Sequence, residues 1–349
     1  MTKKILDQID SEGMYEAVRS FSEQLKQGRA RALKAKFNGW PGDRVTGVVV
    51  AGMGGSAMGG DILAALSVDH ASIPVAVSRS YSLPAWVGPN TAVVASSYSG
   101  NTEESLAAFE DAIARGARVV TISTGGKLAE RAHANNVPLV QLPSGIQPRA
   151  ALPHSLSALL TITEPLQLTA VRPEDWDESI SITAQQSEVM SDLPNPDNPA
   201  MKLAKTLHGR FPVIYSSEQF AAANTRWCNQ MHENAKSFAV GNCLPEMNHN
   251  EIMGWARFQS ELKKLAVIVL RDKEDHKRTQ RRLEVTQSLL APHAHSWNEI
   301  KSEGNSRLAR LLSIMYVSDW VSLYLAILNE TDPSPVGLIS ELKAALARG

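Results

Sequence analysis

A hydroxyl-rich turn is the first candidate for chemistry in this chain. It follows the apolar run Val93–Ala95, and a helical pattern begins directly after it. Its side-chain donors are the hydroxyls of Ser96, Ser97, Ser99 and Thr102, grouped around Gly100. Where a parallel strand gives way to a helix, free backbone N–H groups and the positive end of the helix dipole favour an anion. No lysine or arginine lies in this hydroxyl loop (residues 96–102), which favours the phosphate of a small molecule. An ordinary helix-capping turn is the alternative.

A glycine turn supplies a second candidate. Residues 51–61 read AGMGGSAMGGD directly after the apolar run Thr46–Ala51. A strand, clustered glycines and a helix are typical of a dinucleotide loop, but the spacing departs from the usual fingerprint and no acidic residue closes the second strand. We therefore interpret Gly54, Gly55 and Ser56 as backbone that approaches a small ligand closely. Tight helix–strand packing through glycine is the alternative.

Short apolar runs alternate with helical patterns in the first half of the chain. They predict strands at Thr46–Ala51, Ile73–Ser78, Thr91–Ala95, Arg118–Ser123 and Val137–Leu142. Their unbroken apolar character suits strands that are covered on both faces, as in parallel sheets. The alternation predicts an α/β fold with a doubly wound parallel sheet between two layers of helices. An amphipathic helix over Met14–Leu33 precedes it.

A proline-rich connector, Pro194–Pro199, divides the chain. Three prolines in PNPDNP disfavour a continuous helix. We place the domains at residues 1–193 and 200–349. The second half predicts strands at Phe211–Ser216, Leu265–Leu270 and His295–Ile300, and helices at Glu218–Ala235, Asp275–Leu290 and Asn305–Leu328. The two halves therefore look like two copies of one architecture.

The hydroxyl loop and the glycine turn belong to different strands of the same predicted sheet. Loops at the carboxyl ends of parallel strands converge on a crevice. The convergence predicts a site of the size of a sugar phosphate.

Composition excludes several classes of function. The net charge of −1 and the pI near 6.8 give no field that would attract nucleic acid or an acidic membrane. No uninterrupted apolar run of about 18 residues predicts a membrane span, and the amino terminus lacks a secretory signal. Cys228 and Cys243 are expected to be thiols of a cytoplasmic protein. No cysteine–histidine spacing predicts a metal site.

Further segments complete a resemblance to a known family. Beside the two turns stand Pro148-Arg149, the sequence ENAK at residues 233–236, PEMNHNE at 245–251, DPSP at 332–335 and Lys343 near the carboxyl terminus. Together they resemble the sugar isomerase (SIS) fold and, from about Val48 to Lys343, the bifunctional phosphoglucose/phosphomannose isomerases. The hydroxyl loop marks the broad SIS group, and ENAK with PEMNHNE is more specific.

The resemblance implies two SIS domains and a cofactor-free aldose–ketose isomerase of hexose 6-phosphates. It implies that Ser97, Ser99 and Thr102 bind the phosphate and that Gly54, Gly55 and Ser56 line the sugar site. The implied catalytic residues are Glu233 as base, His249 in ring opening, Arg149 for the enediolate and Lys343. The family's histidine comes from the neighbouring subunit, which implies a homodimer with a shared active site.

The chemistry is consistent with these residue types. Interconverting glucose 6-phosphate and fructose 6-phosphate moves a proton between C2 and C1, which one carboxylate can accept and return on the same face of a cis-enediol. A fixed cation stabilises the developing oxyanion. Histidine can carry a proton to or from the ring oxygen. Mannose 6-phosphate is expected as a second aldose, and no metal or nicotinamide is needed.

Each site residue also has a structural interpretation. Glu233 and Lys236 could form a surface ion pair, His249 could bond only to nearby backbone, and Lys343 could be an ordinary exposed lysine. Glu246 or Glu251 could be mistaken for the base. A buried Asp319 would need a partner. Two other functions remain open, an amino-sugar phosphate isomerase or SIS lyase and a non-catalytic sugar-phosphate sensor.

Overall fold

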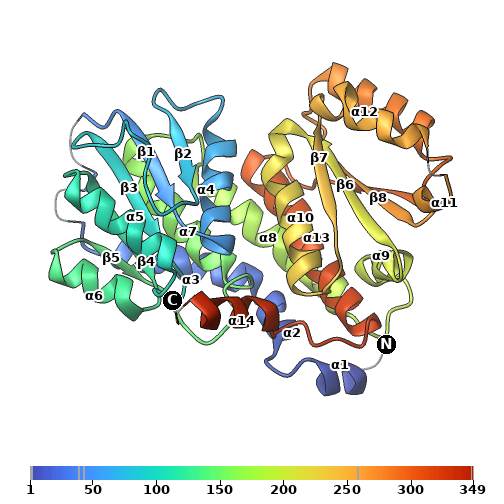
Figure 1. The fold of residues 1–349 in the computed structure, drawn as a ribbon, viewed down its shortest axis with the longest axis horizontal. Coiled ribbons are helices and arrows are strands. Elements are labelled where there is room, and N and C mark those ends of the chain that lie inside the picture. Colours follow the sequence, from blue (N-terminus) through green and yellow to red (C-terminus); the bar gives the residue numbers. More distant parts are fainter. Residues whose placement is uncertain (1–2, 38–39, 42–43, 258, 347, 349) are drawn as a thin grey trace. The chain divides into compact units, whose positions relative to one another are not determined.

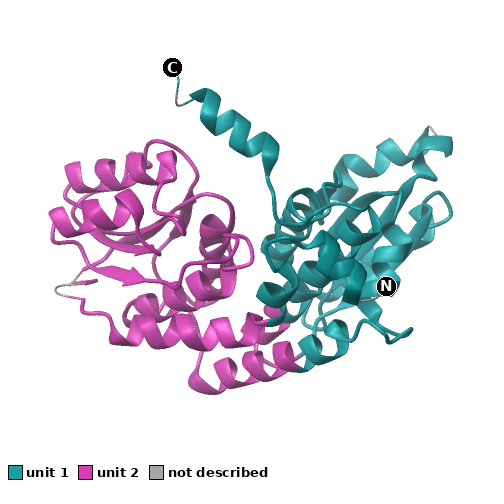
Figure 2. Ribbon diagram, turned by 90° about the horizontal axis from the view of Figure 1, so that it is seen from below, with its two compact units in different colours: residues 1–19, 185–303, 313–349 teal, residues 20–184, 304–312 magenta. Residues whose placement is uncertain are grey.

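The computed structural model describes residues 3–37, 40–41, 44–257, 259–346 and 348. The chain forms two compact units. Unit 1 comprises residues 1–19, 185–303 and 313–349, and unit 2 comprises residues 20–184 and 304–312 (Figure 2). Each unit contains one parallel sheet. The division at Pro194–Pro199 into residues 1–193 and 200–349 stays a prediction.

Unit 2 is built on a five-stranded sheet of order β2-β1-β3-β4-β5, in which every pairing is parallel (Figure 1). Its strands are β1 (Gly47–Ala51), β2 (Val75–Ser78), β3 (Thr91–Ser96), β4 (Arg118–Ser123) and β5 (Leu139–Gln141). Its helices include α3 (Phe21–Lys34), α4 (Gly54–Ser67), α5 (Glu103–Ala114), α6 (Gly126–Ala134) and α7 (Leu152–Thr163). The predicted doubly wound sheet is confirmed.

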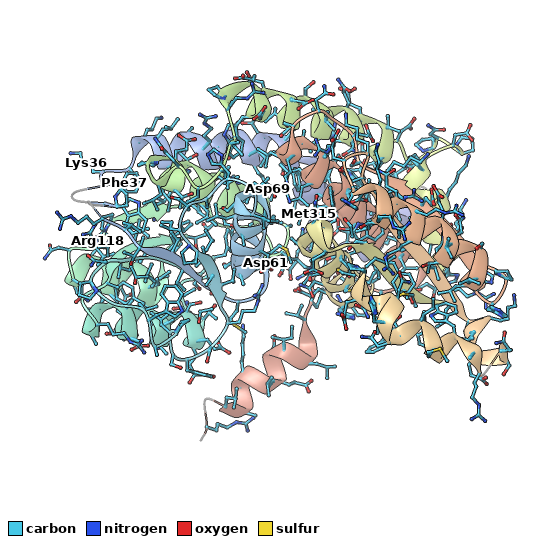
Figure 3. The ribbon with its side chains drawn as sticks, turned by 90° about the horizontal axis from the view of Figure 1, so that it is seen from above. Lys36, Phe37, Asp61, Asp69, Arg118 and Met315 are labelled. Carbon is cyan, nitrogen blue, oxygen red and sulfur yellow. The ribbon has the colours of Figure 1, made fainter. Side chains whose placement is uncertain are left out.

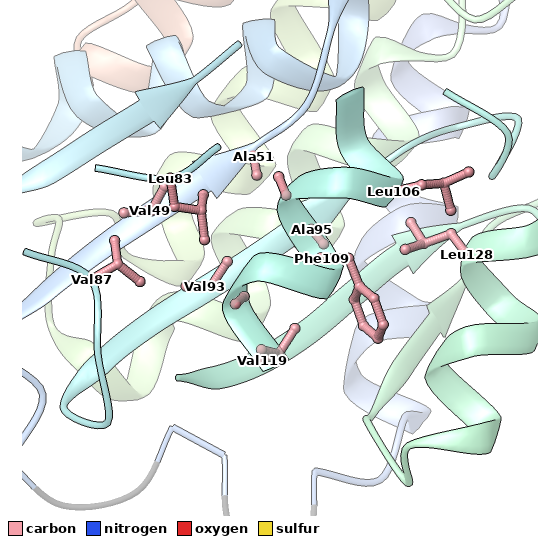
Figure 4. Close-up of a cluster of buried hydrophobic side chains, with 12 residues drawn as sticks. Val49, Ala51, Leu83, Val87, Val93, Ala95, Leu106, Phe109, Val119 and Leu128 are labelled. Carbon is pink, nitrogen blue, oxygen red and sulfur yellow. The ribbon is translucent and has the colours of Figure 1, made fainter. Parts of the chain in front are cut away.

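Side chains along each strand point alternately to the two faces of the sheet, and this alternation determines the core of unit 2. Val49 and Val93 point to one face, where they pack with Phe109 of α5 and Leu128 of α6 (Figure 4). Val50 points to the opposite face and contacts α4. Because both faces are covered, β1 and β3 are buried along their whole length, and their unbroken apolar sequences match that environment.

Unit 1 contains a four-stranded parallel sheet of order β7-β6-β8-β9. Its strands are β6 (Phe211–Ser217), β7 (Val240–Leu244), β8 (Leu265–Arg271) and β9 (Ser296–Lys301). Its helices include α2 (Met14–Arg19), α10 (Ala221–Glu233), α12 (Lys277–Leu290) and α14 (Gly337–Leu346). The order β7-β6-β8-β9 corresponds to the order β2-β1-β3-β4 in unit 2, so the two sheets have the same strand order over four strands. The similarity between the two halves is therefore present in the topology.

Two predicted helices and one strand differ from the structure. The helix predicted over Met14–Leu33 is divided into α2 and α3 at Ser20, and the one predicted over Glu218–Ala235 ends at Glu233. Strand β7 was not predicted because its sequence VGNCL mixes glycine and asparagine with apolar residues. As an edge strand, β7 is half exposed and needs no continuous apolar run. Cys243 on β7 and Cys228 on α10 are both free thiols, as expected.

The long helix α13 (Arg307–Leu328) bears on the expectation that no segment spans a membrane. Among the described residues it alone is long and apolar enough to cross a bilayer, with a mean hydropathy of 1.7. However, 89% of the 18-residue window is buried inside the protein, which is typical of a core helix. Figure 3 labels Met315, which is buried on this helix.

Burial of His154 on α7 is expected to make the stability of unit 2 depend on pH. The residue is 4% exposed, and its Nδ1 atom has no hydrogen-bond partner in the described structure. Burial, reinforced by the positive charge of Arg31, lowers the pKa of His154 to about 4. Since this value lies below the unfolded-state value, the stabilising contribution of neutral His154 is present in full above pH 6.5 and is lost as the pH falls toward 4.

We predict that His154→Leu makes unfolding less sensitive to acid. Between pH 7 and pH 4, the wild-type protein should lose up to about 3 kcal/mol more of its unfolding free energy than the variant. Urea unfolding at several pH values measures this difference. Equal losses in both proteins would contradict the prediction.

Candidate active site

The hydroxyl loop closes on itself through its own side chains. The Ser97 hydroxyl donates to Thr102 Oγ1 at 3.0 Å and accepts from the backbone N–H of Gly100 at 3.1 Å. Ser99 is exposed, and its Oγ accepts from the N–H of Asn101 at 3.2 Å. These contacts use Thr102 and Ser99 as acceptors, so both hydroxyls keep a proton that can be donated to a ligand.

The loop also leads into the amino terminus of α5. Thr102 is the residue before the helix, and its side chain makes no capping hydrogen bond to the first turn among the described residues. Uncapped N–H groups at a helix start are ready donors to an anion. The loop therefore presents neutral donors, as predicted, and its phosphate-binding role stays a prediction.

A turn after β4 holds the hydroxyl loop in shape. The Thr124 hydroxyl donates to the carbonyl of Tyr98 at 2.8 Å, and the N–H of Leu128 donates to the carbonyl of Gly100 at 2.9 Å. Gly100 has a φ of +69°, and a Cβ there would lie 1.8 Å from the carbonyl oxygen of Gly125. Only glycine can occupy this position without displacing the supporting turn.

We predict that Gly100→Ala lowers the unfolding free energy by about 2–5 kcal/mol and weakens sugar-phosphate binding. Gly116→Ala is the matched control, because Gly116 has a φ of +67° but its Cβ would meet only Pro89 at 3.9 Å. Chemical denaturation of both variants separates the cost of the backbone angle from that of the clash. Similar losses in the two variants would contradict the prediction.

The glycine turn packs on the sheet at Gly60 and is open at Gly54, and its role in lining the sugar site stays a prediction. Gly60 packs on the sheet, since a Cβ there would lie 2.9 Å from Val50 Cβ. Gly54 is exposed with a φ of +50°, and a Cβ there would meet nothing within 4 Å. Ser56 Oγ accepts from the N–H of Tyr98 at 3.2 Å and so joins the glycine turn to the hydroxyl loop.

Arg149 lies beside the glycine turn. A Cβ on Gly55 would lie 3.1 Å from the carbonyl oxygen of Pro148 and 3.6 Å from Arg149 Cα. Arg149 itself is 3% exposed, and its Nη1 donates to Gln147 Oε1 at 3.4 Å. Unit 2 thus brings together the glycine turn, the hydroxyl loop and one buried cation.

This cluster lies where the strand order predicts a ligand. In the order β2-β1-β3-β4-β5, β2 is added on one side of β1, and β3, β4 and β5 are added on the other side. The direction in which strands are added therefore reverses between β1 and β3. Open α/β sheets bind ligands at the carboxyl ends of the two strands flanking that reversal. The glycine turn follows β1 and the hydroxyl loop follows β3, so both border the reversal.

In unit 1 the strand order reverses between β6 and β8, and acidic residues lie there in place of neutral hydroxyl donors. Buried Asp272 and Asp275 follow β8, and the N–H of Asp272 donates to Asp275 Oδ2 at 3.2 Å. The Ser302 hydroxyl donates to Asp272 Oδ2 at 2.5 Å. Carboxylates at this edge disfavour a phosphate, so of the two reversals the one in unit 2 is the better candidate for an anion.

Glu233 is the last residue of α10, and α13 fixes that helix. Arg226 of α10 holds Asp319 of α13 through two hydrogen bonds of 3.1 and 2.9 Å, and both side chains are 3% exposed. Gln230 adds a bond of 2.8 Å to the same carboxylate. The predicted partner of buried Asp319 is therefore confirmed. Asn234, next to Glu233, donates to Ser322 Oγ at 3.0 Å.

Lys236 joins the end of α10 to the segment that follows α13. Lys236 Nζ donates to the backbone carbonyls of Glu233 at 2.7 Å and Pro333 at 2.9 Å. The amine therefore closes the end of the helix, and the half-buried Glu233 carboxylate belongs to a rigidly held segment.

His249 ends the 3₁₀ turn Glu246–His249 after β7. Its side chain is exposed, and no hydrogen bond or ion pair of it occurs in the described structure. The hydrogen bond to nearby backbone that was the alternative role of His249 is therefore not present among the described residues. Lys343 is also exposed, on α14, which has no buried residue among those described. Its site role stays a prediction.

Glu233 and His249 lie toward opposite edges of the sheet in unit 1. β6 and β7 are parallel, so α10 runs back from their carboxyl edge to their amino edge. Its 13 residues cover about 20 Å. Glu233 ends that helix, whereas His249 follows the carboxyl end of β7. Within one chain, unit 1 therefore does not bring the predicted base and the predicted histidine together.

Sequence reasoning missed the residues that support the site. They are Thr124 and Gly125 beneath the hydroxyl loop, Arg226 behind Glu233, and Tyr215 and Asn242 beside the His249 loop. The glycine pair after β4 was a usable signal, because it repeats the strand–glycine–helix pattern of β1. Another overlooked contact is the ion pair of Asp61 on α4, labelled in Figure 3, with Arg79 after β2.

Similarity to known proteins extends over nearly the whole chain. Residues 196–346 match the family model of the bacterial phospho-glucose isomerase C-terminal SIS domain. A bifunctional phosphoglucose/phosphomannose isomerase of Caldicellulosiruptor bescii is 40% identical over 336 residues, which are 96% of this chain and 99% of that protein. One of Aquifex aeolicus is 37% identical over 305 residues, 86% of this chain and 91% of that protein.

A solved structure supports the fold. The crystal structure of a hypothetical protein from Thermus thermophilus superposes with a TM-score of 0.74. The match covers 99% of this chain and 94% of that chain at 17% identity, which shows a shared fold and nothing further.

Proposed function

This chain belongs to the bifunctional phosphoglucose/phosphomannose isomerases and is an isomerase of hexose 6-phosphates, and we propose that Glu233 transfers the proton between C1 and C2. The resemblance seen in the sequence is confirmed, and so is the SIS fold. The enzyme interconverts glucose 6-phosphate and mannose 6-phosphate with fructose 6-phosphate. The roles of individual residues are our assignments.

The observation that carries the roles of the hydroxyl loop, the glycine turn and Arg149 is the convergence of three features at the β1/β3 reversal. Neutral donors of the hydroxyl loop, the open backbone at Gly54 and the buried Arg149 meet there. The loop holds the phosphate of the substrate, which orients the far end of the sugar. The Arg149 guanidinium stabilises the oxygen that becomes negative as C1 or C2 loses its proton. Glu233 accepts that proton and returns it to the neighbouring carbon through a cis-enediol.

Incubation with fructose 6-phosphate tests this function directly. The purified protein should form both glucose 6-phosphate and mannose 6-phosphate, and each aldose should return fructose 6-phosphate. Release of ammonia from glucosamine 6-phosphate without conversion of fructose 6-phosphate would instead support an amino-sugar enzyme. Binding of hexose phosphates without turnover would support a sensor.

The active site is shared between two copies of the chain in this proposal. The support is the position of Glu233 and His249 toward opposite edges of one sheet, together with the exposed His249 side chain, which bonds to none of the described residues. A two-fold dimer places the histidine of each copy at the glutamate of the other. His249 then assists opening of the sugar ring in the partner's site.

We predict that two impaired variants regain activity when they are mixed. Glu233→Gln and His249→Asn, mixed in equal amounts and reassociated, should give hybrid dimers with one intact site each, and about a quarter of the wild-type activity. Mixing of purified variants followed by a rate assay measures this recovery. No recovery although hybrids form, or a monomer in light scattering, would contradict the shared site.

A further inference from the structure

The loop that carries His249 is tied to the sheet of unit 1 by one carboxylate. Glu251 Oε1 accepts a short hydrogen bond from the Tyr215 hydroxyl, and Glu251 Oε2 accepts from Asn242 Nδ2 at 2.7 Å. Tyr215 lies on β6 and Asn242 on β7, and they are partners in the strand register. Two donors from neighbouring strands therefore converge on both oxygens of one carboxylate.

The donors are themselves fixed. Tyr215 is 1% exposed, and its oxygen accepts from Trp255 Nε1 at 3.1 Å. Burial, and then the negative charge of Glu251, raises the pKa of Tyr215 far above its ordinary value, so the phenol stays protonated and keeps donating. With both oxygens engaged, Glu251 is suited to hold the loop and not to act as the proton-transferring base.

The remaining anchors surround His249. Met247 is fully buried in the core of unit 1, and Asn248 Nδ2 donates to Thr286 Oγ1 of α12 at 3.0 Å. On the other side, Asn250 Oδ1 accepts from the N–H of Glu251 at 2.6 Å. The backbone of His249 is therefore fixed from both directions, while its side chain is exposed and unbonded in the described structure.

We infer that Glu251 is a positioning residue for ring opening, because its bonds to Tyr215 and Asn242 fix the backbone from which His249 projects. This inference rests on the proposed role of His249. It assigns a function to the carboxylate next to the histidine and explains why a carboxylate is needed. Glutamine offers one acceptor oxygen where two donors require one each.

A double-mutant cycle with fructose 6-phosphate tests the inference. Glu251→Gln should lower kcat about tenfold to a hundredfold, because a small displacement of a reacting group has effects of that size. In the His249→Asn background the same change should alter kcat less than about twofold, since its effect passes through the histidine. The sugar ring also opens slowly in water, so His249→Asn keeps measurable turnover.

A substrate that cannot cyclise gives a second readout. 5-Deoxyfructose 6-phosphate lacks the hydroxyl that closes the furanose ring, so it needs no ring opening. Glu251→Gln and His249→Asn should convert it at wild-type rates. Tyr215→Phe, which removes one of the two donors, should show a smaller loss with fructose 6-phosphate than Glu251→Gln.

Glu299→Gln is the matched control. Glu299 on β9 pairs with Arg271 at 2.9 Å, so the variant loses a carboxylate contact of the same sheet away from the His249 loop. It should keep wild-type kcat, and thermal unfolding compares its stability with that of Glu251→Gln.

The outcomes separate the inference from the function on which it rests. A wild-type protein that does not convert fructose 6-phosphate overturns the function itself. An active enzyme in which His249→Asn changes nothing overturns the role of the histidine. An equal loss from Glu251→Gln in both backgrounds, or no loss at all, overturns the positioning role of Glu251 alone.

Discussion

Glu233→Gln is expected to lower kcat for fructose 6-phosphate by about 10²- to 10⁴-fold, with sugar-phosphate binding nearly unchanged. Proton transfer by a positioned side chain contributes about that much to an enzymatic rate. Glutamine keeps the shape of the side chain but cannot accept the proton from C1 or C2. Steady-state kinetics and calorimetric titration with 6-phosphogluconate measure the two quantities.

Glu218→Gln serves as the control for this variant. Glu218 is exposed and starts the same helical segment at the other edge of the sheet, so its loss should leave kcat unchanged. Since Arg226, Asp319 and Asn234 hold the end of α10 without the Glu233 carboxylate, Glu233→Gln should also fold normally. A kcat within tenfold of wild type in a folded Glu233→Gln would remove Glu233 from the mechanism.

The second large effect is expected from a negative charge in the hydroxyl loop. Ser99→Asp should weaken sugar-phosphate binding by about two to three orders of magnitude, because like charges about 4 Å apart repel by several kcal/mol near a protein surface. Ser99 is exposed, and aspartate can accept the N–H of Asn101 as serine does, so the turn itself should persist.

Two control variants distinguish the effect of a negative charge in the loop from the loss of the Ser99 hydroxyl and from the effect of an added charge elsewhere. Ser99→Ala should weaken binding far less than Ser99→Asp. Ser72→Asp adds the same charge at an exposed position before β2, at the amino edge of the sheet, and should bind as the wild type does. Equal KM values for Ser99→Asp and Ser72→Asp would show that the phosphate lies elsewhere.

The strands were predictable where burial on both faces of the sheet requires a continuous run of apolar residues. β1, β3 and β4 are covered on both faces, and the continuous runs GVVVA, TAVVAS and RVVTIS report that environment. β7 was not predicted because an edge strand does not need apolar residues on both faces, and its sequence VGNCL contains few of them. The break at Ser20 was missed because the helical spacing of apolar residues continues across it.

The site was predictable where local chemistry is dense. Ser97, Ser99 and Thr102 lie together in sequence and in space. Glu233 could not be distinguished from a surface glutamate by spacing alone, since its support comes from Arg226 and Asp319, which are distant in sequence. The same holds for Glu251, whose partners Tyr215 and Asn242 lie on two strands, one of them unpredicted.

The central claim is that the enzyme moves a proton between C1 and C2 of a hexose 6-phosphate. Proton NMR of the purified protein with fructose 6-phosphate in heavy water tests it most directly. Proton transfer by Glu233 predicts that glucose 6-phosphate and mannose 6-phosphate appear with deuterium at C2, that recovered fructose 6-phosphate carries deuterium at C1, and that Glu233→Gln suppresses both. Aldoses formed with no deuterium at C2, beside ketose with none at C1, would contradict it.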